Sequence, residues 1–177
     1  MKKSKIIMLS ALALIVAGAA VLTAVFGKKT EENAPKTEFL FSLWDGDVGW
    51  EDTREFAVPE YAGTKFVWNS LSVSADGEEL FWGMPVWNVY LSDLNGDGKR
   101  EIISEVSIGS GIVDDRIIAY DLSEKQGYQL ENRFYSNFSL FLNNGELWVR
   151  EKKYGGDEVI NERKLALSEM KEYDGTF

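Results

Sequence analysis

Nine consecutive residues, Asp93-Leu94-Asn95-Gly96-Asp97-Gly98-Lys99-Arg100-Glu101, carry the most specific pattern of metal-binding chemistry in the sequence. Oxygen-bearing side chains stand at positions 1, 3, 5 and 9 of this stretch. Ca²⁺ prefers about six to eight oxygen ligands, and a tight loop can supply them from alternate residues. The backbone carbonyl at position 7 adds a further oxygen, and glycine at position 6 permits the sharp turn. The pattern predicts a calcium site formed by Asp93, Asn95, Asp97, Lys99 and Glu101.

This stretch differs from an EF-hand. An EF-hand needs a bidentate acid at position 12, where this chain has Ser104, and flanking helices, where this chain has β-rich sequence. A calcium loop that closes a β-hairpin fits better. The alternative is an ordinary solvated turn, because Asn-Gly and Asp-Gly are turn formers. Three alternating Asp or Asn residues followed by Glu101 favour the metal site.

A second candidate site surrounds the acidic turn Asp45-Gly46-Asp47, which Trp44 and Trp50 flank. Exposed tryptophans can stack on a sugar or cell-wall glycan, although core packing is the commoner fate of this residue. The turn and the adjacent Glu51-Asp52 could hold a second cation or form a glycosidase-type acid/base pair; a solvated acidic turn is the favoured alternative. The candidate ligand-binding residues are Trp44, Asp45, Asp47 and Trp50.

The chain of 177 residues contains no histidine and no cysteine. It therefore cannot build a Ser-His-Asp triad, a cysteine nucleophile, a histidine-liganded zinc site or a disulfide. We assign no catalytic residues and expect a protein that is not an enzyme.

Charge divides the sequence into two parts. Residues 1–29 contain five lysines and no acid, whereas the remaining residues hold 14 basic and 29 acidic groups, a net charge of −15. Nucleic acids and anionic lipid headgroups are bound through Lys and Arg, so this acidic part excludes both as partners and suits a surface that attracts cations.

Residues 6–26 form an uncharged run of 21 residues bracketed by lysines. A helix of this length spans roughly 31 Å, which matches the hydrocarbon core of a bilayer. We expect a transmembrane signal-anchor over residues 1–29, although a cleaved signal peptide ending near Ala17-Gly18-Ala19 is an alternative that would give a secreted protein. Positive-inside reasoning favours a single-pass membrane protein with an extracytoplasmic C-terminal domain. Residues 30–37 are a polar linker and residues 38–177 the extracytoplasmic domain.

From residue 38 onward, short β-rich runs alternate with Gly, Asn and Asp turns about every ten residues, which predicts an antiparallel all-β domain. The clearest hairpin turns at Asn143-Asn144-Gly145. Val86–Ser92 and Arg116–Leu122 are apolar on both faces, so they should lie centrally, covered on two sides. The predicted strands are Arg54–Val58, Thr64–Asn69, Glu79–Trp82, Val86–Ser92, Arg100–Ser107, Arg116–Leu122, Tyr128–Glu131, Ser136–Asn143, Glu146–Lys152 and Arg163–Ser168, with one or two helical turns at most in Leu165–Tyr173.

The run VYLSDLNGDGKREIISEVSIGSGIVDDRIIAYDL resembles an FG-GAP/VCBS-type blade, in which a strand, a DxDxDG-type calcium loop and further strands form a sheet. The resemblance implies that Asp93, Asn95, Asp97 and Glu101 take the ligand places, with Asn95 in place of the usual second Asp. Such units normally repeat to close a propeller, and this chain has one clear loop. We therefore expect propeller-blade-like or sandwich sheets after one N-terminal hydrophobic helix.

A longer resemblance covers roughly residues 38–168 and includes WDGDVGWEDTREFAVPEYAGTKFVW, GMPVWNVYLSDLNGDGKRE, SIGSGIVDDRIIAYD and LFLNNGELWV. These segments resemble the extracytoplasmic C-terminal domain of some antirepressor-type, β-lactam-sensor-like membrane metallopeptidases of Gram-positive bacteria. The peptidase part uses an HExxH zinc helix, which a chain without histidine cannot form. The resemblance therefore implies a stand-alone sensory domain.

These observations lead to a membrane-anchored, extracytoplasmic, Ca²⁺-binding sensory or interaction domain without catalytic activity. Its expected partners are the membrane, through the N-terminal helix, and a membrane sensor protein or a cell-wall component. The alternatives from other functional classes are a carboxylate-based cell-wall glycan hydrolase and a structural surface adhesin module.

Overall fold

The computed structural model describes residues 37–173 and Gly175. The predicted anchor over residues 1–29 and the linker up to residue 36 lie outside the described residues. Within the described part, no helix combines the length and apolar character needed to cross a membrane.

The described residues form thirteen strands and two short 3₁₀ helices, and every strand pairing is antiparallel. The elements are β1 (Thr37–Ser42), β2 (Thr53–Phe56), η1 (Pro59–Tyr61), β3 (Phe66–Asn69), β4 (Ser72–Ala75), β5 (Glu78–Trp82), β6 (Asn88–Ser92), β7 (Glu101–Ile108), β8 (Asp114–Asp121), β9 (Gln126–Leu130), β10 (Ser136–Asn143), β11 (Glu146–Lys153), β12 (Val159–Lys164), η2 (Leu167–Glu169) and β13 (Lys171–Tyr173). The predicted all-β antiparallel class is confirmed.

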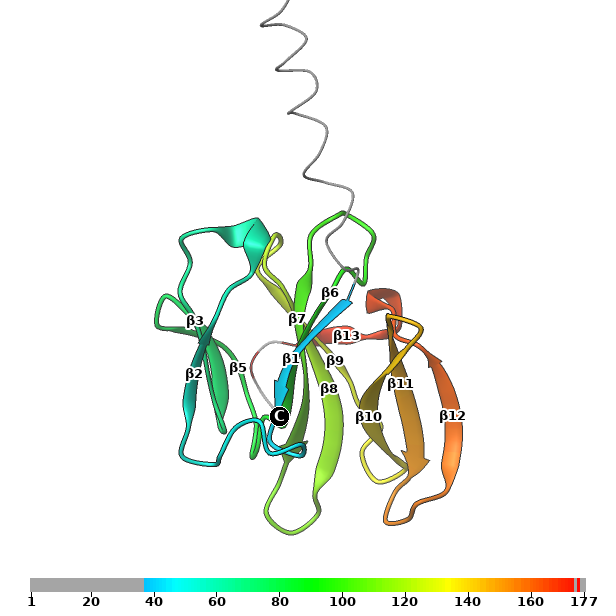
Figure 1. The fold of residues 1–177 in the computed structure, drawn as a ribbon. Helices are drawn as coiled ribbons and strands as arrows, with labels where there is room; N and C mark the ends of the chain where they lie inside the picture. Colours follow the sequence, from blue (N-terminus) through cyan, green and yellow to red (C-terminus); the bar gives the residue numbers. More distant parts are fainter. Residues whose placement is uncertain (1–36, 174, 176–177) are drawn as a thin grey trace, which may run out of the picture. The chain divides into compact units, whose positions relative to one another are not determined.

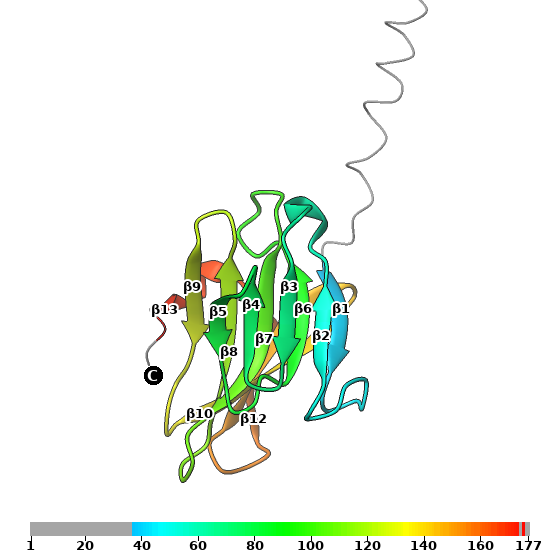
Figure 2. The ribbon, with the colours of Figure 1, turned by 90° about the vertical axis from the view of Figure 1, so that its left-hand side faces the viewer.

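The strands form three sheets that lie as layers. The middle sheet has the order β1-β6-β7-β8-β9-β13, with the sheet β2-β3-β4-β5 on one side and the sheet β10-β11-β12 on the other (Figure 1). Figure 2 shows the four-stranded sheet in front of the middle sheet. Each sheet is largely a meander of neighbouring hairpins, so most contacts in it are local along the chain.

Two hydrophobic cores fill the spaces between the layers, and the alternation of side chains along the middle strands feeds both. On β7, Ile102 and Val106 face the first core, where they pack with Trp68 of β3. Ile103 of β7 faces the second core, where it packs with Val149 of β11. Because both faces of the middle sheet are covered, its central strands carry apolar residues on both faces, as predicted for Val86–Ser92 and Arg116–Leu122.

Three strands and the C-terminal segment differ from the sequence prediction. β1, β4 and β13 were not predicted, and β12 ends at Lys164, so the predicted strand at Arg163–Ser168 is wrong over most of its length. The expected turns near the C-terminus reduce to η2, which β13 follows at once. The predicted hairpin is confirmed: Asn143 pairs with Glu146 across Asn144-Gly145, both of which have positive φ.

Candidate functional site

The candidate calcium loop joins β6 to β7. Ser92, the last residue of β6, pairs with Glu101, the first residue of β7, so residues 93–100 close an antiparallel hairpin. Two glycines in the loop, Gly96 and Gly98, have φ values of +80° and +85°. Glycine reaches this left-handed region without steric cost, which lets the chain reverse direction twice in a few residues.

The side chains at positions 1, 3 and 5 of the loop turn back onto its own backbone. Asp93 accepts hydrogen bonds from the N–H of Gly96 at Oδ1 (2.6 Å) and from the N–H of Gly98 at Oδ2 (3.1 Å). Asn95 and Asp97 each accept one from the N–H two residues later, at 2.9 and 2.8 Å. These bonds hold the three oxygen-bearing side chains toward the inside of the turn.

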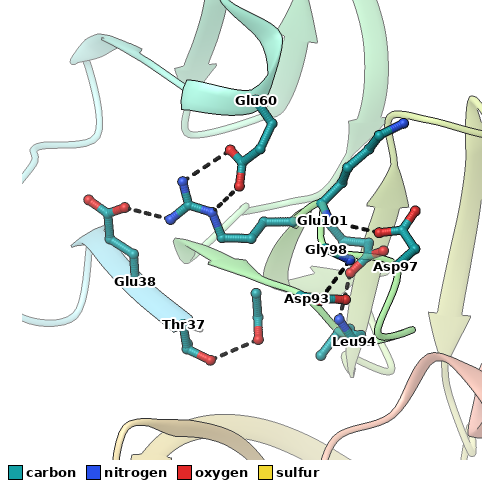
Figure 3. Close-up of polar contacts among 11 residues, drawn as sticks. Thr37, Glu38, Glu60, Asp93, Leu94, Asp97, Gly98 and Glu101 are labelled. Atoms are coloured by element: carbon teal, nitrogen blue, oxygen red, sulfur yellow. Dashed lines mark hydrogen bonds and ion pairs between the residues drawn. The ribbon is translucent and has the colours of Figure 1, made fainter. Parts of the chain in front are cut away.

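Glu101 closes the loop from beneath. It is 2% exposed, and its Oε2 accepts a 2.7 Å hydrogen bond from the N–H of Leu94 (Figure 3). The pKa of Glu101 is raised to about 7, mainly by burial; the hydrogen bonds it accepts lower the pKa, and the negative charges of Asp121 and Asp93 raise it. The carboxylates at the loop are therefore close enough to repel one another, which is an arrangement that a divalent cation stabilises.

Asp121 and Ser123 also reach the loop, and the sequence motif did not reveal them. The amide of Asn95 donates to Asp121 Oδ2 (3.2 Å), and the hydroxyl of Ser123 donates to Asp97 Oδ2 (3.4 Å). Asp121 is the last residue of β8 and Ser123 lies in the turn after it, and both are beside the start of β7 because Ile102 pairs with Tyr120. The register of β7 against β8 places them beside the loop, and the nine-residue motif does not encode that register.

The loop residues fit calcium in donor type. Each of the predicted side-chain ligands offers an oxygen atom, and Ca²⁺ prefers hard oxygen ligands. Among the described residues no three acidic side chains gather closely enough to form a metal site by themselves. A complete ligand set would therefore also need the amide oxygen of Asn95 and the backbone carbonyl of Lys99.

Arg100 anchors the end of the loop to two other elements. Its side chain is 4% exposed and donates to both carboxylate oxygens of Glu60 in η1, at 2.7 and 3.1 Å. It also donates to Glu38 of β1 at 2.9 Å, so Glu60 and Glu38 lie on the opposite side from Asp97 and Glu101 (Figure 3). Arg100 thus fixes the backbone between the predicted ligands Lys99 and Glu101. Its guanidinium pairs with Glu60 and Glu38, which are not predicted ligands.

The structure separates the four candidate ligand-binding residues Trp44, Asp45, Asp47 and Trp50. Trp44 stacks on Trp87 with ring centroids 3.9 Å apart, and Trp50 meets the same Trp87 edge-on at 5.8 Å. Trp44 and Asp45 line a cavity beside the middle sheet, whereas Asp47 and Trp50 do not line it. Trp87 was predicted as a strand residue, and nothing local in the sequence marks it as the shared contact of Trp44 and Trp50.

Comparisons with protein-family models, curated proteins and solved structures return no match to this chain. The resemblances drawn from the sequence motifs therefore stay predictions.

Proposed function

We propose that this chain is a membrane-anchored, extracytoplasmic, Ca²⁺-binding domain that acts in sensing or protein interaction and has no catalytic activity of its own. The observation that carries the calcium assignment is the β6–β7 loop, where Asp93, Asn95 and Asp97 turn inward above the buried Glu101. Asp121 adds a fifth oxygen-bearing side chain in contact with this loop.

The sheet arrangement supports the same proposal. β6–β9 form a four-stranded antiparallel meander that carries the loop, and β2–β5 form a second one. We regard these sheets as blade-like units, in line with the resemblance of residues 38–168 to the extracytoplasmic domain of antirepressor-type sensor peptidases. The sensory role and the possible partners, a membrane sensor protein or a cell-wall component, follow from that resemblance.

Thermal unfolding with and without Ca²⁺ tests the calcium proposal. Ca²⁺ that binds only the folded state should raise the free energy of unfolding by about 2.7 kcal/mol at a hundred times its dissociation constant. The melting temperature should therefore rise with millimolar Ca²⁺ and fall back when a chelator is added.

Two variants make this test specific for the loop. Asp97→Ala removes a predicted ligand and should abolish the response to Ca²⁺, whereas Asp157→Asn, which removes the same charge from a fully exposed side chain between β11 and β12, should keep it. A melting temperature that neither chelator nor millimolar Ca²⁺ alters would contradict the calcium proposal.

The membrane proposal has its own test. The intact chain should be recovered in the membrane fraction, and protease added to intact cells should remove an epitope fused to its C-terminus. Both results are expected because the acidic domain lies outside and the basic N-terminus inside. Recovery of the full chain from the culture medium would instead support the secreted alternative.

A further inference from the structure

A cavity of about 530 Å³ opens beside the middle sheet, on the side that faces β10–β12. Trp44 and Asp45, just after β1, line it together with Trp87, which directly precedes β6. From the strands themselves come Tyr90 of β6, Glu105 of β7 and Asp115 of β8. It shares none of the predicted calcium ligands.

The cavity is acidic. Asp45, Glu105 and Asp115 line it, and within residues 37–173 none of the three forms an ion pair. Lys152, the basic residue of the lining, lies 3.8 Å from the carboxylate of Asp157. The pKa of Glu105 is raised to about 7, mainly by burial and in smaller part by the charges of Asp115 and Asp45. Glu105 is therefore affected by both neighbouring carboxylates, and a positive charge in the cavity would relieve this repulsion.

Hydrogen-bond acceptors are held in place in the walls. The indole N–H of Trp87 donates to Ser107 Oγ (2.7 Å), and this hydroxyl donates to Asp115 Oδ1 (2.5 Å). The backbone N–H of Leu140 donates to Glu105 Oε1 at 2.5 Å. The buried Oδ1 of Asn137, also in the lining, has no hydrogen-bond partner among the described residues. An occupant with several N–H donors would match these groups.

An aromatic surface stands beside the carboxylates. Trp44 is 65% exposed and lies almost parallel to Trp87, with an angle of 11° between the rings. An exposed tryptophan face attracts a cation through its ring quadrupole and also packs against methylene groups.

We propose that this cavity binds the primary ammonium group of an aliphatic amine. An ammonium group carries one positive charge and three N–H donors, which suit the carboxylates and Asn137, and its aliphatic stem suits Trp44. The same chemistry is offered by a free amine and by a lysine side chain of a peptide. The inference rests on the proposed sensory role and names a ligand class for it, but it does not depend on the calcium loop.

The test is titration of the full chain with n-butylammonium, followed by tryptophan fluorescence and calorimetry. n-Butanol, which lacks the charge, should not bind, and tetramethylammonium, which lacks N–H donors, should bind more weakly. Nα-acetyl-lysine methylamide distinguishes the two sources: tighter binding than n-butylammonium assigns a peptide lysine, and weaker binding assigns a free amine.

Matched variants locate the binding. Trp44→Ala and Asp45→Asn should each raise the dissociation constant about fivefold. Asp47→Asn changes the same residue type in the same segment outside the cavity lining and should leave it within about twofold. Asp93→Asn should impair the response to Ca²⁺ and spare amine binding, so failure of one proposal is separable from failure of the other.

Four results would overturn the inference. They are equal binding of n-butanol or tetramethylammonium, no binding of n-butylammonium, equal weakening by Asp45→Asn and Asp47→Asn, and displacement of the amine by Ca²⁺ that Asp93→Asn does not affect. The third result would indicate general attraction to the acidic surface, and the fourth a metal site in the cavity.

Discussion

At the scale of single residues, Gly127 is a position where an added methyl group would meet close neighbours. A Cβ there would lie 2.8 Å from Cδ1 of Tyr173 and 3.2 Å from its backbone oxygen. Gly127 pairs with Tyr173 where β9 meets β13, so the two strands would have to separate. We predict that Gly127→Ala lowers the free energy of unfolding by about 1–3 kcal/mol, measured by urea unfolding.

The matched control is Gly111→Ala. A Cβ at Gly111 meets no heavy atom within 4 Å, and its backbone does not have a positive φ. This substitution should change stability by less than about 1 kcal/mol, since it acts mainly on the unfolded chain. Equal effects of the two substitutions would show that close packing at Gly127 is not what matters.

The candidate calcium ligands could be predicted because they lie within nine residues, where spacing alone defines the loop. Asp121 lies 26 residues beyond Asn95, and its approach depends on the register of β7 against β8. The cavity residues Glu105 and Asp115 were missed for a related reason. They become neighbours only when separate strands pair, and no spacing rule along the chain encodes that.

At the scale of elements, Arg100 joins the start of β7 to η1 and β1. We predict that Arg100→Met lowers the free energy of unfolding by about 2 kcal/mol, because Glu60 and Glu38 lose their common partner. Urea unfolding measures the effect. Glu38→Gln removes one half-exposed carboxylate and should cost less than about 1 kcal/mol. A larger loss for the Glu38 variant would contradict this ranking of the two contacts.

Elements were predictable where turn chemistry and alternation agree. Asn144-Gly145 sets the β10–β11 hairpin, and every residue pair of that hairpin follows from the turn. β4 (Ser72–Ala75) has three small side chains and one valine, so its sequence carries a weak strand signal. It is a strand because β3 and β5 flank it on both sides. β13 likewise forms because it adds to the edge of β9.

At the scale of the whole molecule, the middle sheet is covered on both faces, and a carboxylate lies at one of the two layer contacts. Glu105 projects from β7 toward β10 and accepts a hydrogen bond from Leu140. Apolar residues on both faces of β6 and β8 predicted that the sheet would be covered on two sides. It could not predict that a glutamate would lie within the covered region, because Glu105 reads as a polar position of an ordinary strand.

This placement makes stability depend on pH. Burial raises the pKa of Glu105 from its ordinary 4.5 to about 7. Below pH 4.5 the carboxyl is protonated in both the folded and the unfolded chain. Between pH 4.5 and 7 the folded state retains the proton more strongly, so the contribution of Glu105 to the free energy of unfolding falls as the pH rises, by on the order of 3 kcal/mol at most.

Glu105→Gln isolates this contribution from the other acidic groups. Glutamine keeps an oxygen that can accept the hydrogen bond from Leu140 but cannot ionise, so the variant should lose less stability than the wild type as the pH rises from 4.5 to 7. Urea unfolding of both proteins at a series of pH values gives the two slopes. Parallel slopes would mean that Glu105 is solvated like a surface carboxylate, and that the contact between the middle sheet and β10 opens to water in solution.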